Sequence, residues 1–449
     1  MLKPELIGES FIRISEEYQL HLILEVFKLK KLSVLEKTES ARNEIIELAS
    51  ELVKISTPNP PGSTSECVRF IRSYFDQHGV PTKIFERTKG KTNIVAHIKG
   101  ADDHTVLWLG HLDVVPEGDT ASWKHEPYGG KVVGDFIYGR GTSDMKGSCA
   151  AAMVATRILG EAGKLPFNTD FWFTCDEEVG GGDGAEWLSK ENMIRGDCCI
   201  IGDSSGSTRS KPFIDAGCKG MLWTKIKATG RTAHGSTPHL GDNALDKIMA
   251  ITPHIEKMRN YRLNVAKDLR PALKTSVDYL LSNRELSEEQ RRTTKRLYNY
   301  PTVALNMLNG GVKINVVPDH AEAFYDIRLT PGIDFAATKK QLLKLIESPR
   351  IEGITHEFIQ EQTGYFESPK SKFAKQLSKA VRTVTENEPK FKILTGGTDA
   401  ASLTKIGIPC LGYGAGLEGQ AHAPDEHVPI DDLVMAAKVY ALFPLIYRA

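Results

Sequence analysis

The sequence predicts an α/β protein whose main domain is interrupted by a smaller α+β domain. Short apolar strands alternate with helices in the first half of the chain, which is typical of a sheet covered on both faces. Near Gly217 the pattern changes to longer alternating strands, and the first pattern returns from Ser368. At 449 residues the chain is also too long for one core, so at least two domains are expected.

The leading residues predict three helices. Residues 1–40 form an extension in which five apolar residues keep near-helical spacing: Leu20, Ile23, Leu24, Phe27 and Leu32. We expect this helical extension to pack on the main body, with a partner-binding arm as the alternative. A second helix begins after Ser40 and ends near Thr57, because the prolines that follow cannot continue it. A third begins at Ser65 and is ended by Gly79.

Strands and helices then alternate through the main domain. The expected strands are Thr82–Phe85, Asn93–Ile98, Thr105–Leu109, Asp170–Thr174 and Cys198–Gly202. The expected helices are Gly147–Ala162 and Gly184–Asn192. This alternation favours a sheet with helices on both faces.

Residues 218–363 predict the inserted domain, which divides the main domain into residues 1–217 and 364–449. Its expected strands are Gly220–Thr229, Thr302–Asn309, Ala321–Leu329 and Thr355–Gln362, and its helices are Asn243–Met258 and Phe335–Ile346. The order βαββαβ predicts a ferredoxin-like fold. A charged helical insert, Arg259–Tyr300, interrupts it, and Ser287 and Gln290 are spaced there as a capping box.

The composition excludes two classes of partner and indicates a compartment. Lys plus Arg and Asp plus Glu both number 57, so nothing favours a nucleic-acid or membrane-surface partner. No apolar segment approaches the length of a membrane span, and no signal peptide is visible. The seven cysteines include no CxxC pair, which fits reduced, mostly buried thiols. We therefore expect a soluble, cytoplasmic protein.

Acids and histidines stand where strands of the main domain end or where glycines allow sharp turns. They are His111 with Asp113, Asp144, the run Asp176-Glu177-Glu178, Asp203 and His422. His111 and Asp113 are spaced i, i+2 after an apolar run, so they project to the same side of an extended strand. Each position alone has a simpler explanation. A glycine-flanked Asp is most often a turn residue, a run of acids is usually a solvated loop, and His422 could lie on a surface loop.

Together these side chains predict a two-metal site. Imidazole nitrogens and carboxylate oxygens, without a suitably placed Cys, suit Zn²⁺, Co²⁺ or Mn²⁺. Two ions need about three or four protein ligands each, with one carboxylate free to bridge them. The candidate ligands are His111, Asp144, Glu178, Asp203 and His422. Of the remaining acids, Asp113 is placed to fix the tautomer of His111, and Glu177 could take a proton from a metal-bound water.

Longer motifs extend this pattern from about Ile45 to the C-terminus. In order they are Gly110-His111-Leu112-Asp113-Val114-Val115-Pro116, Gly139-Arg140-Gly141-Thr142-Ser143-Asp144-Met145-Lys146-Gly147, Thr174-Cys175-Asp176-Glu177-Glu178, Ala233-His234-Gly235-Ser236, Asn315-Val316-Val317-Pro318-Asp319, Gly396-Gly397-Thr398-Asp399 and Ala421-His422-Ala423-Pro424-Asp425-Glu426. This series resembles the di-zinc metallopeptidase family of acetylornithine deacetylase, succinyl-diaminopimelate desuccinylase, aminoacylase-1 and carboxypeptidase G. The resemblance implies a zinc-hydrolase sheet-and-helix catalytic domain, interrupted by a ferredoxin-like lid and dimerisation domain.

The resemblance also implies a role for each metal-site residue. One zinc ion would take His111 and Asp203, and the other would take Glu178 and His422. Asp144 would bridge the two ions and be followed by a non-proline cis peptide. Glu177 would be the general base.

The lid domain is implied to form a homodimer and to complete the site. His234 would reach the partner subunit's active site and polarise the scissile carbonyl; the alternative is a turn residue before Gly235. Asn315, Arg328 and the Gly397-Thr398 loop would bind the substrate's carboxylate, for which an Arg fork is the usual partner. For Arg328 a salt bridge within the lid is the alternative.

One departure from the family pattern bears on the substrate. Deacetylases and desuccinylases of the family usually carry Glu in a Gly-Glu-Pro-Thr context where this chain has Gly202-Asp203-Ser204-Ser205. Asp is a competent zinc ligand, so the predicted metal site stands, but the assignment to those two enzymes is weakened. We expect hydrolysis of the amide C–N bond of N-acyl amino acids by a metal-activated water. A dipeptidase or carboxypeptidase is the alternative, and outside enzymes a metal-binding module that has lost catalysis.

Overall fold

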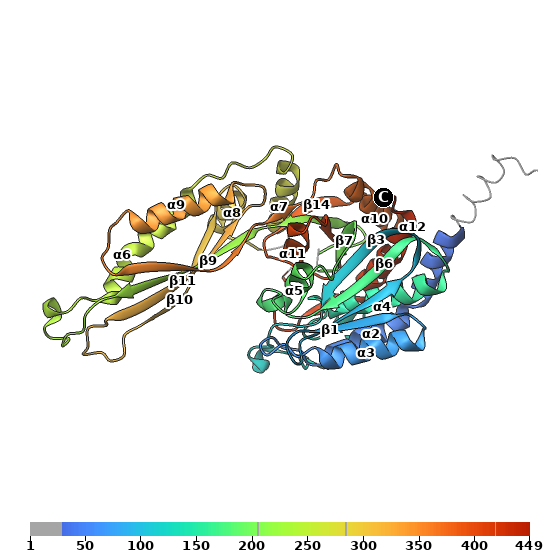
Figure 1. Cartoon of the computed structure of the whole chain (residues 1–449), viewed down its shortest axis with the longest axis horizontal. Helices are drawn as coiled ribbons and strands as arrows, with labels where there is room; N and C mark the ends of the chain where they lie inside the picture. The colour runs from blue at the N-terminus through green and yellow to red at the C-terminus, as the bar shows by residue number, and fades with distance from the viewer. Residues whose placement is uncertain (1–28, 204–205, 283–284, 418) are drawn as a thin grey trace, which may run out of the picture.

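Two bodies of unequal size make up the chain, and they are joined side by side in the view of Figure 1. The computed structural model describes residues 29–203, 206–282, 285–417 and 419–449. The larger body carries both the beginning and the end of the described chain, and the smaller one lies between β8 and β13 in sequence. The smaller domain is therefore inserted into the larger one.

A mixed sheet forms the centre of the larger domain. In the described residues it has the order β1-β2-β6-β3-β7-β15-β8-β13, with β14 paired to β8. Its strands are β1 (Thr82–Glu86), β2 (Thr92–Ile98), β3 (Gly100–His111), β6 (Leu165–Thr174), β7 (Cys198–Ile201), β8 (Phe213–Cys218), β13 (Tyr365–Phe366), β14 (Lys390–Leu394) and β15 (Cys410–Gly412). Because β3 runs parallel to both β6 and β7, the carboxyl ends of these three strands meet at one edge.

Helices cover both faces of this sheet, as the alternating pattern predicts. One face packs against α2 (Arg42–Lys54), α3 (Ser65–Gln77), α4 (Lys146–Glu161), α10 (Lys372–Thr385) and α12 (Ile430–Ile446). The other face packs against α5 (Ala185–Lys190) and α11 (Ala400–Lys405). Strand β3 shows the division directly, because Val106 and Trp108 belong to the first core and Leu107 and Leu109 to the second.

The sequence-based prediction makes two central strands too short. Strand β3 begins five residues before Thr105, and β6 begins five residues before Asp170. The early part of β3 contains Asp102 and Asp103, and a register shift separates Asp102 from Thr105. Exposed acids and a bulge break the apolar alternation from which strands are recognised.

The inserted domain has the predicted ferredoxin-like order. Its elements are β9 (Gly220–Thr229), α6 (Ala244–Glu256), β10 (Thr302–Gly310), β11 (His320–Leu329), α9 (Phe335–Glu347) and β12 (Ile354–Gln362). The four strands pair antiparallel in the order β10-β11-β9-β12. Both helices pack on one face of this sheet around a separate core, and the other face carries the alternate, largely polar residues.

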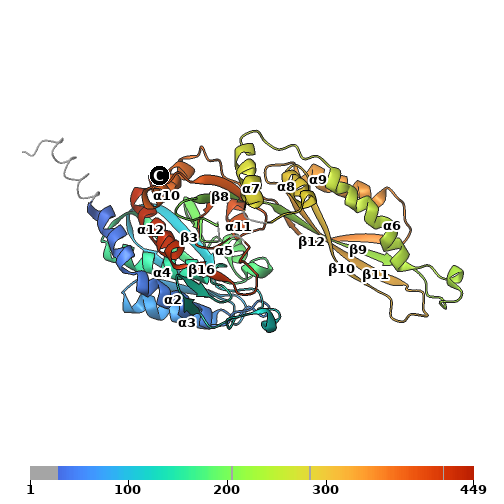
Figure 2. The same ribbon diagram turned by 180° about the vertical axis from the view of Figure 1, so that it is seen from behind.

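The charged insert of this domain contains α7 (Arg270–Ser282) and α8 (Glu288–Arg296), and α8 begins with the predicted capping box between Ser287 and Gln290. Helix α7 returns to the larger domain, beside β14 and β8 (Figures 1 and 2). The Tyr298 hydroxyl donates to Ile393 O at 2.7 Å, and Ile393 N donates to Ser276 Oγ at 2.7 Å. We therefore propose that α7 and the segments flanking it belong with the main core, although they lie within the 218–363 segment. Helix α8 stays with the smaller domain, where Arg296 Nη2 donates to Asn260 Oδ1 at 3.1 Å.

Part of the predicted N-terminal extension is described. Residues 29–40 are helical, Val34 is buried in the main core, and Lys30 Nζ donates to Lys164 O at 2.8 Å. This part packs on the main body, as expected; residues 1–28 lie outside the described part of the chain.

All seven cysteines are buried, and none forms a disulfide. Among the described helices none has the length and apolar character needed to cross a membrane.

A buried ion pair joins neighbouring strands of the main sheet and yields a stability prediction. Lys392 Nζ on β14 lies 2.6 Å from Asp215 Oδ1 on β8, with both side chains almost fully buried. Lys392→Met is expected to lower the free energy of unfolding by about 3–5 kcal/mol, because the buried carboxylate loses its cation. Denaturant unfolding followed by circular dichroism measures the change. A loss below about 1 kcal/mol would show that the pair contributes little.

Candidate metal centre

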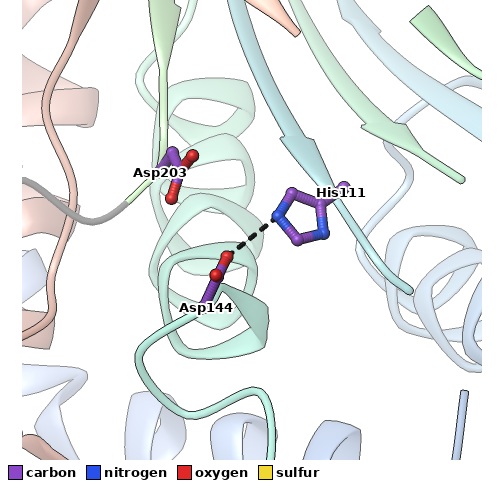
Figure 3. Close-up of side chains that lie close together, drawn as sticks. All are labelled: His111, Asp144 and Asp203. Carbon is purple, nitrogen blue, oxygen red and sulfur yellow. Dashed lines mark hydrogen bonds and ion pairs between the residues drawn. The ribbon is translucent and has the colours of Figure 1, made fainter. Parts of the chain in front are cut away.

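Five side chains from five separate loops or strand ends converge at the carboxyl edge of the main sheet. The ligand atoms of His111, Asp144 and Asp203 lie within 4.8 Å of one another, and so do those of Asp144, Glu178 and His422. Asp144 therefore belongs to both groups. Figure 3 shows the first group: His111 at the end of β3, Asp203 after β7 and Asp144 before α4.

The two oxygens of Asp144 face different histidines. His111 Nε2 lies 3.0 Å from Asp144 Oδ1, and His422 Nε2 lies 3.4 Å from Asp144 Oδ2. His422 Nε2 also lies 3.2 Å from Glu178 Oε2. A carboxylate with one oxygen toward each group is the geometry expected of a ligand shared by two ions.

Local backbone geometry presents Asp144 to the site. Gly139 and Gly141 have φ angles of +144° and +91°, which favour glycine and allow the chain to turn after β5 (Phe136–Tyr138). The Asp144–Met145 peptide is cis, as the resemblance implies. Met145 is fully buried, and its Sδ accepts a hydrogen bond from His111 N at 3.4 Å. The residue after the shared carboxylate thus contacts the backbone of a second candidate ligand.

Asp113 contacts His111 differently from the sequence expectation. His111 Nδ1 lies 2.9 Å from the Asp113 main-chain carbonyl, which fixes the ring tautomer with Nδ1 protonated. The Asp113 carboxylate is 3.7 Å from Nδ1, too far for a hydrogen bond. It instead accepts hydrogen bonds from Glu177 N and Glu178 N, each at 3.2 Å. The carboxylate of Asp113 therefore holds the turn that carries the predicted base.

Glu177 lies in the same cavity as Asp144, Glu178 and Asp203, but it belongs to neither three-residue group. Burial raises the pKa of Glu177 well above its usual value, and the carboxylates of Asp399 and Glu178 raise it further, against the opposing effect of His111. Glu177 is therefore a buried carboxyl beside the two ligand groups, in the place where a group that moves protons is needed.

The side chains around the two ligand groups include more carboxyl groups than cations. Two histidines face six carboxyl groups: Asp113, Asp144, Glu177, Glu178, Asp203 and Asp399. Hydrogen bonds to Asp144 and Glu178 raise the pKa of His422 to about 10. Burial raises the pKa of Asp399 to about 7. Carboxylates gathered at this density and paired with imidazoles fit a pair of divalent cations, which would neutralise them.

A cavity of about 340 Å³ places three of the predicted substrate-binding residues beside the carboxylates. Arg328, Gly397 and Thr398 line it, the first from β11 of the lid and the others from the loop after β14. Arg328 Nε donates to Asp326 Oδ1 at 2.8 Å, and its guanidinium lies over the Trp223 ring. The salt bridge within the lid, which was the alternative role for Arg328, is thus present. Arg328 also lines the cavity, so the two roles are compatible.

His234 and Asn315 do not line this cavity in the described residues. They lie beside each other, because Gly235 N donates to Asn315 O at 2.8 Å and His234 pairs with Val316. Both are exposed. The 230–243 segment that follows β9 lies at the end of the lid remote from the larger domain (Figure 1).

Sequence reasoning did not identify two further parts of the site: the face of the lid sheet that lines the cavity, and one buried acid. Met221, Trp223, Gln360 and Gln362 line the cavity from β9 and β12. Their alternation on a predicted strand marks a face opposite to the core, but nothing local shows what that face meets. Asp399 is buried and accepts a hydrogen bond from Thr174 Oγ1 at 3.2 Å. It stands in the Gly396-Gly397-Thr398-Asp399 motif, which is the signal that could have found it.

Comparisons with known proteins agree with this geometry. A sequence model described as peptidase family M20/M25/M40 matches residues 107–445. The chain is 27% identical over 409 residues to a succinyl-diaminopimelate desuccinylase of Methylocella silvestris, covering 88% of this chain and 96% of that one.

Two solved structures share the fold. An M20 family metallo-carboxypeptidase from Sulfolobus solfataricus has a TM-score of 0.76 at 24% identity, covering 90% of this chain and 99% of its own. Human carnosine dipeptidase 1 has a TM-score of 0.69 at 19% identity, covering 92% and 98%. With the family model matching three quarters of its length, the chain belongs to peptidase family M20/M25/M40 and is a metallohydrolase of that family.

Proposed function

We propose that the protein hydrolyses the amide C–N bond of N-acyl amino acids, in the manner of a deacetylase or desuccinylase. One observation carries the proposal: Glu177 lies beside two ligand groups that share Asp144, without belonging to either. A protein that only binds metal has no need of such a carboxyl, whereas amide hydrolysis needs a group that moves a proton. This argues against a metal-binding module that has lost catalysis.

The donor atoms fit two zinc ions per subunit, with Co²⁺ or Mn²⁺ also compatible. His111, Asp144 and Asp203 would hold one ion, and Asp144, Glu178 and His422 the other. When bound, such a pair supplies Lewis acidity, which lowers the pKa of water and stabilises negative charge on a carbonyl oxygen. Asp113 supports both groups, because its carbonyl orients His111 and its carboxylate holds the turn of Glu178.

The chain's own residues supply the proton transfers. A carboxylate oxygen of Glu177 takes a proton from the attacking water as the new C–O bond forms. The same oxygen then gives the proton to the amine nitrogen as the C–N bond breaks, so the base is regenerated. His234, from the partner subunit, donates a hydrogen bond to the carbonyl oxygen on which negative charge develops.

Arg328 and the Gly397-Thr398 loop account for a preference for substrates with a free carboxylate. Arg328 lines the cavity from the lid, and Gly397 and Thr398 line it from the catalytic domain. A carboxylate bound between them would draw the lid toward the metal ligands. Asn315 lies beside His234, so we propose that it acts on the same carboxylate from the partner subunit.

A homodimer through the lid explains where His234 acts. The edge strand β10 and the loop after it expose five apolar side chains: Leu305, Met307, Leu308, Val312 and Ile314. Val312 and Ile314 are 94% and 103% exposed, which is unusual for large apolar residues unless a partner covers them. His234 and Asn315 lie next to this surface, because Val316 pairs with His234. A second copy docked here would also carry its own His234 and Asn315.

A dipeptidase or carboxypeptidase is the second candidate, because the same groups cleave a peptide bond beside a free carboxylate. The Asp203 position favours it, since that residue departs from the Glu of the family's deacetylases and desuccinylases. The described likenesses to a carboxypeptidase and a dipeptidase support the shared fold and do not choose between the substrates.

Metal removal and a substrate panel test the proposal together. Chelator-treated protein is expected to lose activity, and Zn²⁺ or Co²⁺ should restore it, because the bound ions would supply the Lewis acidity that activates water. The panel sets acetyl-, succinyl- and formyl-amino acids beside dipeptides, with kcat/KM as the measurement. Higher values for dipeptides would replace the first candidate by the second. Hydrolysis that survives complete chelation would contradict the metal-dependent mechanism.

A further inference from the structure

A buried ion pair joins two of the ligand-bearing loops at their bases. Arg140 precedes Asp144 by four residues, and Glu426 follows His422 by four. Arg140 Nη1 lies 2.7 Å from Glu426 Oε2, and the two residues are only 2% and 0% exposed. They are 286 residues apart in sequence, so the contact is tertiary.

Glu426 uses both carboxylate oxygens to hold the loop that ends at Asp144. Its Oε1 accepts hydrogen bonds from Ser143 N at 2.8 Å and Asp144 N at 2.9 Å. Its Oε2 accepts from Gly141 N at 3.1 Å, in addition to Arg140 Nη1. One side chain thus accepts hydrogen bonds from three backbone N–H groups of a loop that lies outside any helix or strand.

Arg140 extends the same contact to two other loops. Its Nη1 also donates to Ala423 O at 3.2 Å, and its Nη2 donates to His422 O at 3.3 Å and Pro116 O at 3.4 Å. Pro116 ends the motif that begins with Gly110 and His111. The guanidinium also lies over the Trp123 ring, which confines it from one side. Five donors in a planar fork allow one residue to make all these contacts.

We propose that Arg140 and Glu426 are positioning residues that set the separation of His111, Asp144 and His422, and thereby the affinity of both metal sites. The inference rests on the metal roles given above under the proposed function. Neither residue touches the ligand atoms; each acts through backbone atoms of ligand residues or of their loops. Groups that orient metal ligands typically change metal affinity by 10–100-fold when they are replaced.

The experiment measures Co²⁺ binding to the metal-free full-length protein, by titration and by the visible absorption of the bound ion. Glu426→Gln keeps the side-chain shape but removes the charge and turns one oxygen acceptor into a donor. Arg140→Lys keeps the charge, but its single nitrogen cannot reach the carbonyls of both the Pro116 loop and the His422-Ala423 loop. We expect both variants to bind Co²⁺ about 10–100-fold more weakly, with a changed absorption spectrum.

Lys392→Met is the matched control, because it breaks an equally buried ion pair of the same domain away from the ligand loops. It is expected to lower stability while leaving Co²⁺ affinity and the spectrum unchanged. Circular dichroism and a thermal melt establish that each variant is folded at the titration temperature. If Glu426→Gln does not fold, Arg140→Lys alone carries the test.

The possible results distinguish a failure of the positioning role from a failure of the proposed metal function. Wild-type Co²⁺ affinity and spectrum in a folded Arg140→Lys variant would overturn the positioning role. A loss of affinity in Lys392→Met equal to that in the test variants would also overturn it, because general destabilisation would then explain the effect. Wild-type protein that binds no Co²⁺ would overturn the proposed metal function itself.

Discussion

Replacing Glu177 by alanine is expected to lower kcat by about 10²–10⁴-fold while leaving the bound metal in place, because it removes general acid–base catalysis. Glu177 belongs to neither group of candidate ligands, and its backbone N–H is held by Asp113, which the substitution does not alter. Steady-state kinetics on the best substrate of the panel gives kcat. Elemental analysis of the same preparation gives the metal content per chain.

The control for this prediction is Glu191→Ala, which removes an exposed carboxylate outside the cavity. It is expected to behave like the wild type in both measurements. Turnover close to the wild-type value in Glu177→Ala would remove Glu177 from the mechanism. Loss of metal from that variant would instead identify it as a ligand, contrary to the two groups that share Asp144.

Replacing His234 by alanine is expected to lower kcat by about 10²–10³-fold without loss of metal, which is the typical effect of removing one donor to a developing oxyanion. His234 is exposed, its Nδ1 lies 2.7 Å from Ser236 Oγ, and it does not line the cavity of its own chain in the described residues. The matched control is the exposed His239→Ala, expected to be fully active.

Mixed dimers decide whether His234 acts across the interface. When Glu177→Ala and His234→Ala chains are mixed and re-associated at random, half of the dimers combine one chain of each kind. If His234 acts in trans, one site of each such dimer contains both wild-type groups, so activity recovers to about a quarter of the wild-type value. If it acts within its own chain, every site lacks one group and no activity returns. An absence of recovery with mixed dimers present would contradict the proposed dimer arrangement.

The sequence by itself determined the element order and the kind of chemistry. Strand β9 and helix α9 begin at the residues that the apolar period predicts, because both bury one face and expose the other. His111 and Asp203 could be singled out because each follows a short apolar run, and parallel strands bring such ends to one edge. These are local signals, and each can be read from the sequence without knowledge of the fold.

The tertiary structure decided which atoms meet. Asp113 orients His111 through its main-chain carbonyl, over only two residues of the chain. Its carboxylate instead accepts from Glu177 N, more than sixty residues away, and this contact depends on how β3 lies beside β6. The charged helical insert lies within the sequence of the inserted domain, yet its helix α7 packs on β14 of the main sheet.

The contact between Arg140 and Glu426 shows the general reason most clearly. Both residues stand in recognisable motifs, but they meet across 286 residues, and one side chain's hydrogen bonds join loops from three parts of the chain. Sequence periodicity records which face of an element is apolar; it does not record which distant backbone that face will meet. The ligands of this site could therefore be predicted from the sequence, and the side chains that hold them in place could be recognised only once the chain was folded.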